Sequence, residues 1–534
     1  MLIEAVNKKV LICTSVGAHG PAVNHDLALA KAFLEKGVKT EFLLCDGILP
    51  ACEACNIYVI EEPEMIKFGP KKHCSECFAN GFSSFKHLSA PINRYSSFLD
   101  PSDLQFADEV VNKLKESEYK TLIIDNIDVG EDAHAGALRY FAVGDLNEEK
   151  NGMVILKRYL KASVVALRVI QRAFDSIKPD FAIFHHGIYI PQGVIGKVAR
   201  QRGISVVNWS VGYRKNTFIY SHNDTYHKTM IDEPENLWKD FKLSENQETT
   251  LDEYLESRIS SKKDWIKFND EPVEDLDVIR RELNLDARPI IVLLTNVTWD
   301  AQLFYKNNAF PSIIDWLEFT INYFRNRKDL QLIVRVHPAE IRGTMATRQP
   351  ILQVMRNRIK EIPENVFLVD AASKISTYSL ATLADSTIIY GTKTGVELAA
   401  RGFTVIVVGE AWIRNKGLTI DVSSIPEYTG ILDRLPLSQK SEDQIIKLSK
   451  QYAYHYFFRR LIPINVFSYS EKKKGTLERI KDRVAGMFRQ KSVVAKSPFH
   501  INFSTLHTQS FLTDKGLSSV CKNVLEKKEF IFEE

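Results

Sequence analysis

Two stretches of the chain alternate short apolar runs with helical stretches, and this alternation limits the fold more than any other feature. In the first stretch, Lys9–Ser15 is an expected strand, a Gly17–Gly20 turn follows, and an expected helix over about 24–36 leads to a strand at Thr40–Cys45. Strand–turn–helix–strand units predict a doubly wound α/β sheet. Further strands of this series are expected at Thr121–Asp125, Phe181–Phe184 and Ser205–Trp209.

The second series begins at Pro289–Leu294, after a polar and charged stretch at 232–287. Two series in 534 residues predict two domains. We expect an N-terminal Rossmann-like domain at 1–265, a linker at 266–287, a second Rossmann-like domain at 288–440, and a helical C-terminal segment and tail at 441–534. The other strands of the second series are expected at Leu330–Val336, Val366–Val369, Thr387–Tyr390 and Val405–Val408.

Composition narrows the class of protein. Hydrophobic residues make up 45% and charged residues 26%, the balance of a soluble globular protein. The net charge of +3 gives no whole-protein field for nucleic acid, so no nucleic-acid partner is expected. Neither a spanning helix nor a signal peptide is recognised, so a cytoplasmic protein is expected. Peripheral association with the inner face of the membrane stays open.

Five of the seven cysteines lie between Cys45 and Cys77, in an expected cysteine-rich insertion at about 45–80. Two C-x2-C pairs separated by 18 residues match the spacing of a four-thiolate structural zinc site. Cys45 or His73 could replace one ligand. An iron–sulfur cluster, a redox pair and ordinary thiols are the alternatives. The expected zinc ligands are Cys52, Cys55, Cys74 and Cys77.

The stretch Tyr390–Asp421 gives the most direct indication of function. An expected strand ends at Gly391, a small polar loop follows, and a helix begins around Val396. Amides and hydroxyls in such a loop bind anions well, which predicts a ligand that carries phosphate. The loop residues are Thr392, Lys393, Thr394 and Gly395.

Three motifs of the C-terminal half resemble the capsule polysaccharide biosynthesis glycosyltransferases, which include the Kdo transferases. They are RVHPAE, SKISTYSLATLADSTIIYGTKTGVELAARG and GEAWIRNKGLTID. The resemblance implies the GT-B fold, in which two Rossmann-like domains face a cleft. It also implies transfer of a sugar from a CMP- or UDP-linked donor to a surface-polysaccharide or glycan acceptor, which could be lipid-linked.

The resemblance implies that His337 and Pro338 contact the donor phosphate and that His337 assists departure of the nucleotide. Asn296, Thr298 and Trp299 follow the first strand of the second domain, where donors commonly bind. Glu397 is expected at ribose hydroxyls or at the helix start, and Arg414 and Lys416 at a sugar carboxylate or pyrophosphate. Ser376 and Thr377 are expected to contact the donor phosphate, with helix capping alone as the alternative explanation. The further expected donor-binding residues are Arg335 and Glu410 with the loop Gly391–Gly395.

The acceptor side is expected in the first domain. Transfer with inversion needs a base for the acceptor hydroxyl, and the candidates are Glu131, Asp132, His19 and Asp46. No Asp-x-Asp motif ends a strand of the second domain, so no catalytic metal is expected. Arg139 is expected on a helix surface, with an anionic acceptor as the alternative. The expected acceptor-binding residues are His185, His186, Tyr189 and Arg214.

Two other functions fit the same fold. A sugar-nucleotide epimerase or hydrolase would also place carboxylates and histidines in the cleft. A non-catalytic polysaccharide assembly protein would bind no nucleotide and would be indifferent to loss of His337. Fold alone does not separate these functions, whereas the His-Pro and Gly-Leu-Thr-x-Asp motifs favour the transferase.

Overall fold

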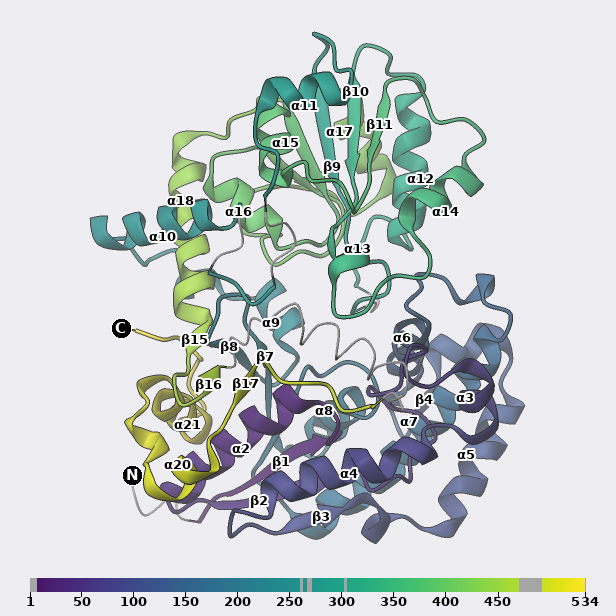
Figure 1. Cartoon of the computed structure of the whole chain (residues 1–534), viewed down its shortest axis with the longest axis vertical. Coiled ribbons are helices and arrows are strands. Elements are labelled where there is room, and N and C mark those ends of the chain that lie inside the picture. Colours follow the sequence, from purple (N-terminus) through teal and green to yellow (C-terminus); the bar gives the residue numbers. More distant parts are fainter. Residues whose placement is uncertain (1–6, 260–262, 267–270, 302–304, 470–491, 534) are drawn as a thin grey trace, which may run out of the picture.

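The computed structural model describes residues 7–259, 263–266, 271–301, 305–469 and 492–533. It shows two α/β domains, one above the other in Figure 1. The sheet of the first domain has the order β15-β8-β7-β6-β1-β2-β3. Neighbours from β7 to β3 are parallel, whereas β8 and β15 are antiparallel additions. The strands are β1 (Lys9–Ser15), β2 (Lys39–Leu44), β3 (Ile92–Arg94), β6 (Phe181–His185), β7 (Ser205–Val211), β8 (Thr217–His222) and β15 (Ile462–Pro463).

Both faces of this sheet are buried, which explains its near-continuous apolar strands. Along β1, Val10 and Ile12 enter the core with α2 (Gly20–Glu35) and α21 (Lys515–Glu526). Leu11 and Cys13 point to the opposite face, under α6 (Gly130–Phe141), α7 (Gly152–Ile177) and α8 (Gln192–Gln201). Period-two alternation of side chains along a strand places them on opposite faces.

The second domain has a six-stranded sheet in the order β11-β10-β9-β12-β13-β14, with every neighbouring pair parallel. Helices α12 (Ile313–Phe324), α14 (Ile351–Arg358) and α17 (Ile425–Asp433) cover one face. Helices α15 (Thr377–Leu383), α16 (Thr394–Ala400) and α18 (Asp443–Tyr454) cover the other. The strands are β9 (Ile290–Leu294), β10 (Gln331–Arg335), β11 (Val366–Val369), β12 (Ser386–Ile389), β13 (Val405–Val407) and β14 (Ile420–Asp421). The predicted α/β class with two Rossmann-like domains is confirmed.

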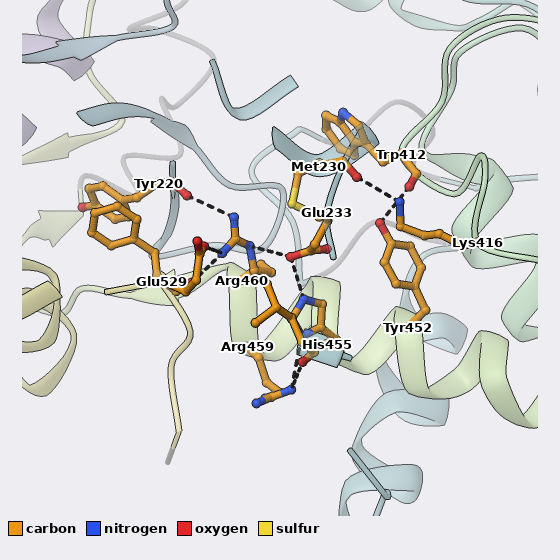
Figure 2. Close-up of polar contacts among 12 residues, drawn as sticks. Tyr220, Met230, Glu233, Trp412, Lys416, Tyr452, His455, Arg459, Arg460 and Glu529 are labelled. Carbon is orange, nitrogen blue, oxygen red and sulfur yellow. Dashed lines mark hydrogen bonds and ion pairs between the residues drawn. The ribbon is translucent and has the colours of Figure 1, made fainter. Parts of the chain in front are cut away.

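The chain returns from the second domain to the first along α18 and the helical turn η5 (His455–Arg460) (Figure 1). Strand β15 then pairs with β8, and α21 packs on α2. At the crossing, buried Glu233 accepts from His455 at 2.9 Å and pairs with Arg460 at 3.3 Å, as Figure 2 shows. The C-terminal segment is therefore part of the first domain's core.

Two local expectations differ from the structure. The expected strand Thr121–Asp125 is wrong: η2 (Glu116–Thr121) precedes a two-residue hairpin of β4 (Ile123–Ile124) and β5 (Ile127–Asp128), outside the main sheets. Asp125 and Asn126 have φ values of 51° and 61°, and two successive left-handed residues form a tight hairpin turn instead of continuing a strand. The cysteine-rich insertion is largely helical, with α3 (Glu62–Phe68) and α4 (Lys71–Phe85).

Candidate active site

A cavity of about 420 Å³ lies between the two domains. The first domain and the segment after it contribute Tyr213, His227 and Arg258 to the wall, and the second contributes loops at the carboxyl ends of β9, β10, β12 and β13. A smaller cavity of about 80 Å³ adjoins it inside the second domain. Ligands of doubly wound sheets bind at this end of the strands. The side chains that line both cavities belong to Arg258, His337, Thr392 and Thr394.

A buried carboxylate fixes two cations at this junction. Glu397, on α16, is fully buried and accepts from Lys393 Nζ at 2.6 Å and from Arg258 Nε at 3.0 Å. Burial alone would raise the pKa of Glu397, but Arg258 and Lys393 lower it to about 2. Burial, with Arg258 adding to it, lowers the pKa of Lys393 to about 8. Both cations are therefore present at neutral pH beside two carboxylates, Glu397 and Asp264, the second of which pairs with Arg258, and the charge of Lys393 is lost above about pH 8.

His337 is held in a defined orientation at the end of β10. Its Nδ1 accepts a hydrogen bond from the Ala339 amide at 3.0 Å, and its own amide donates to Thr295 Oγ1 at 3.0 Å. Burial, then the charges of Lys393 and Arg335, lowers the ring pKa to about 4, so the ring is neutral at pH 7. An accepting Nδ1 puts the proton of a neutral ring on Nε2. His337 is thus a hydrogen-bond donor at the junction of the cavities.

Two threonine hydroxyls and a close contact between two backbone loops complete the junction of the cavities. Thr392 Oγ1 donates to Thr394 Oγ1 at 3.2 Å and accepts from the Thr394 amide. A Cβ at Gly391 would lie 2.8 Å from the Glu410 carbonyl oxygen, so only glycine allows the two loops to meet. Asn296, Gly391, Lys393 and Glu410 line the larger cavity, as the sequence predicted for donor-binding residues. Arg335, Pro338, Ser376 and Thr377 line the smaller one.

Within the smaller cavity, two polar residues also have structural partners. Ser376 caps α15 by accepting from the Ser379 amide. The guanidinium of Arg335 donates to the carbonyl oxygens of Asp370 and Ser373, and burial lowers its pKa to about 10. These bonds hold the β10 and β11 loops together beside His337, so the cavity is preformed.

Several expected donor contacts point away from the cavities. Arg414 is buried and donates to the carbonyl oxygen of Gly409 and to Ser423 Oγ. These bonds hold its own loop together. Lys416 donates to the carbonyl oxygens of Met230 and Ile231 and lies over Tyr452, as Figure 2 shows, so it joins the domains away from the ligand space. Glu397 holds Arg258 and Lys393 in place and reaches the cavities only through these two side chains.

Three residues that were expected near the donor have packing roles instead. Thr298 lies against Gly144 of the first domain. Trp299 is buried and donates to Thr347 at 3.0 Å. Gly395 lets α16 approach Ile389 of β12, since a Cβ there would lie 2.5 Å from that side chain.

In the first domain, a row of histidines ends at the cavity wall. The rings of His19 and His185 stack at 4.7 Å between centroids, His186 lies 5.6 Å from His185, and His227 lies 5.8 Å from His186. Burial holds all four imidazoles neutral by lowering their pKa values, those of His19 and His227 to about 4. The Nδ1 atoms of the first three and Nε2 of His227 are buried and make no hydrogen bond to any residue that the structure describes. Buried polar atoms of this kind indicate a polar ligand or water.

The loop after β6 is strained, since His186, Gly187 and Tyr189 all have φ between 61° and 82°. Tyr189 receives a hydrogen bond from the Ala301 amide at 3.0 Å and lies 3.4 Å from Asp300, so it joins the two domains. Arg139 is half-buried, stacks on the Tyr189 ring at 5.3 Å and donates to the carbonyl oxygen of Glu53, so it is not a freely exposed residue of the helix surface. Strain of this kind persists where surrounding contacts enforce it, often at functional sites.

The expected bases differ in position. Asp132 is buried and pairs with Lys197 at 2.7 Å on α8, so it stabilises the first domain and does not face the cleft. Asp46 accepts from Ser96 at the end of β3. Glu131 is better placed, because it lies near Tyr305, which lines the larger cavity. Burial raises the pKa of Tyr305, and the carboxylate of Glu131 raises it further.

Arg214 does not line either of these cavities. Its guanidinium stacks on Phe458 at 4.2 Å, because the β7–β8 turn places it toward η5. The adjacent Gly212 and Tyr213 line the cavity instead. Tyr213 also lies under Lys393, at 4.4 Å from Nζ to the ring centroid.

Sequence reasoning missed several wall residues. Arg258 follows α10 (Glu245–Ser257) in the polar segment that carries no motif, and only the fold brings it to Glu397. Glu53 is buried between two cysteines, 3.9 Å from His185 Nδ1. Asp300 lies in the loop that follows the carboxyl end of β9, and this position in the sheet could have suggested it. The other missed wall residues are Tyr213, His227, Tyr305 and Trp412.

The cysteines are not arranged as the expected four-thiolate site. Cys52 and Cys55, whose sulfurs are 3.9 Å apart, lie in a turn against α7, whereas Cys74 and Cys77 lie one helical turn apart on α4. Cys77 accepts from the Ala18 amide. Within the described ranges, no three or more His, Cys, Asp or Glu side chains are placed to hold a metal ion. As arranged in the described residues, these side chains do not fit zinc.

Residues 200–445 match the sequence model of the family described as capsule polysaccharide biosynthesis protein. This region contains the cavity walls of the second domain, and the predicted resemblance is confirmed there. The comparison with curated proteins gave no match.

Solved structures similar to this chain include two from Thermosulfurimonas dismutans KpsC. The β-Kdo 2,4 transferase is 14% identical, with a TM-score of 0.35 over 56% of this chain and 86% of that one. The β-Kdo 2,7 transferase is 11% identical, with a TM-score of 0.33 over 60% and 90%. A putative UDP-N-acetylglucosamine 2-epimerase from Listeria monocytogenes is 11% identical, with a TM-score of 0.27 over 84% and 93%. These scores do not decide between a transferase and an epimerase.

Proposed function

We propose that the protein transfers a sugar from a CMP- or UDP-linked donor to a glycan acceptor in surface-polysaccharide synthesis. The observation that carries this proposal is the convergence of Arg258, Lys393 and His337 where the two cavities meet. Two cations and a neutral hydrogen-bond donor suit the phosphate of a nucleotide sugar. The family match of residues 200–445 supports the same function.

In this proposal, the donor phosphate lies at the junction. Lys393 and Arg258 offset its charge, and the Nε2–H group of His337 donates a hydrogen bond to the oxygen that leaves with the nucleotide, while the ring keeps its proton. Thr392 and Thr394 supply further donors. Since these groups are already fixed around Glu397, little reorganisation accompanies the reaction. No metal is required to hold the phosphate, because the cations of the wall can do so.

On the acceptor side, we assign Asp300 as the general base. It lines the larger cavity at the end of β9, near the contact with the first domain. The residue is exposed, so an acceptor hydroxyl can reach the carboxylate, which takes up its proton. The row from His19 to His227 would hold acceptor hydroxyls through its unpartnered ring nitrogens. Displacement by an acceptor activated in this way inverts the anomeric centre.

The test measures nucleotide release from CMP- and UDP-sugars with and without capsule-derived oligosaccharides. Wild-type protein should release one nucleotide only in the presence of acceptor, with inversion of the linkage seen by NMR. Asp300→Asn should reduce kcat by about 10²–10⁴-fold while it preserves donor binding. Glu131→Gln is the comparison, and equal loss in both variants would contradict the assignment of Asp300.

Two results would replace the proposal itself. An epimerised free sugar formed without acceptor would identify an epimerase. Absence of binding to every nucleotide sugar would favour the assembly-protein function.

A further inference from the structure

A groove of about 590 Å³ lies on the first domain, away from the cavities described above. It runs between α3, α5 (Pro101–Lys113) and α7, with the loop Gly47–Pro50 at one end. These helices lie together at the right of the lower domain in Figure 1. Large apolar side chains are exposed along it: Phe68 is 43%, Leu104 45% and Val154 47% exposed. A cluster of such side chains in water usually marks a binding surface.

The charges around this apolar strip have one dominant sign. Five basic residues line the groove, against one acidic residue, Asp108, which is paired with Lys161. Arg158 is anchored by the carbonyl oxygen of Ile66 at 2.7 Å. The ammonium group of Lys67 lies 5.0 Å from the ring of Phe68. The basic residues are Lys67, Lys71, Lys157, Arg158 and Lys161.

A short loop joins this groove to the acceptor side of the cleft. Pro50 lines the groove, and three residues later Glu53 lies beside His185, with its carbonyl oxygen bonded to Arg139. Tyr159 of α7 donates to the carbonyl oxygen of Cys52 at 3.2 Å and holds the loop in place. The groove and the proposed acceptor site are therefore only a few residues apart in the sequence.

We propose that this groove docks the protein on a bilayer that contains anionic phospholipid. Phe68, Leu104 and Val154 enter the boundary between headgroups and acyl chains, and the basic residues contact lipid phosphates. Apolar side chains ringed by lysines suit this interface because the lysine stems lie along apolar surface while their charges reach the headgroups. The proposal goes beyond sugar transfer and does not depend on it.

The test is co-sedimentation with phosphatidylcholine vesicles, with and without about 30 mol% phosphatidylglycerol. Wild-type protein should bind the anionic vesicles and dissociate as salt is raised. The double variant Lys67→Glu/Lys71→Glu should bind about tenfold more weakly or worse. Phe68→Ser/Leu104→Ser should also lose binding, because the apolar contact is removed.

The matched control is Lys328→Glu/Lys440→Glu, which makes the same charge change at exposed positions of the second domain. This control should bind vesicles like the wild type. Nucleotide binding should be unchanged in every groove variant, which separates this test from that of the proposed function. Wild-type protein that stays in the supernatant, equal binding to neutral vesicles, or equal losses in control and groove variants would each overturn the proposal.

Discussion

His337 is the residue on which the chemistry of the site most depends. Its Nδ1 is occupied by the Ala339 amide, so Nε2 is the donating atom toward the cavities. Replacement by alanine should weaken nucleotide binding by about 10–100-fold, because a hydrogen bond to a charged group is worth about 1.5–3 kcal/mol. Calorimetric titration with the preferred nucleotide measures this loss. His337→Gln restores a donor and should recover part of the affinity, whereas equal affinity in wild type and His337→Ala would contradict the assigned role.

Glu397 links the site to stability. Its folded-state pKa of about 2 is below the ordinary value of 4.5, so its stabilisation is fully present above pH 4.5 and is lost as the pH falls toward 2. The shift corresponds to a contribution on the order of 3 kcal/mol at neutral pH.

Glu397→Gln should therefore be less stable than the wild type near pH 7, and the difference should shrink under acid conditions. Urea unfolding at several pH values measures it. The control is Glu253→Gln, whose carboxylate is 67% exposed and pairs with Lys263. A gap between wild type and Glu397→Gln that stays constant down to about pH 3 would show that the carboxylate is not held by the cations.

At the scale of elements, most of the second sheet could be predicted because its strands are continuous apolar runs that end in Gly, His-Pro or small polar residues. Parallel strands bury both faces, so position in the sheet follows from hydrophobicity alone. The motif loop Gly391–Thr394 and His337 consequently line the cavities at the carboxyl ends of these strands.

Other features depend on tertiary contacts that no local pattern carries. Arg258 reaches Glu397 across 139 positions of the sequence. Arg414 and Lys416 lie in a motif loop, yet their partners are backbone carbonyl oxygens that only the folded chain presents. Thr121–Asp125 has the composition of a strand but turns back on itself after two residues.

The return of the chain along α18 and η5 is an element whose stability can be tested directly. Glu233 is 1% exposed there and pairs with Arg460 (Figure 2). Glu233→Gln should lower the free energy of unfolding by about 1–3 kcal/mol, because it removes the buried one of the two counter-ions of Arg460 and leaves only the half-exposed Glu529. The nucleotide affinity of the folded protein should be unchanged.

A nearby exposed pair supplies the control for this prediction. Glu235 pairs with Lys239 at 2.7 Å, and both side chains are about half exposed. Glu235→Gln should change the free energy of unfolding by less than about 0.5 kcal/mol. Similar losses in both variants, measured by denaturant unfolding, would contradict a specific role of the buried pair.

The cysteine segment allows a compositional test. Zinc was predicted from spacing, but no three or more of the described His, Cys, Asp or Glu side chains are placed to hold a metal ion, so we expect less than about 0.2 zinc per chain in freshly purified, unchelated protein. Elemental analysis measures it. About one zinc per chain would restore the spacing argument and would mean that α4 and the Cys52–Cys55 turn approach each other when metal binds.

At the scale of the whole molecule, the domains meet at more than one point. Tyr189 accepts from the Ala301 amide, and Gln349 accepts from the amides of Gly144 and Asp145. The described helices include none with the length and apolar character of a membrane span. The cavity therefore lies between two domains that are already in contact, with Lys393 on the wall of the second domain and neutral histidines on the first.

The most direct test of the account is calorimetric titration of CMP and UDP near pH 7 and near pH 9, on wild type and Lys393→Met. Since the pKa of Lys393 is about 8, most of its charge is lost at the higher pH. We predict that one of the two nucleotides binds the wild type about tenfold more weakly near pH 9, and that binding to Lys393→Met is weaker and independent of pH over this range. No binding of either nucleotide, or the same pH dependence in the variant, would contradict a phosphate site at Arg258, His337 and Lys393.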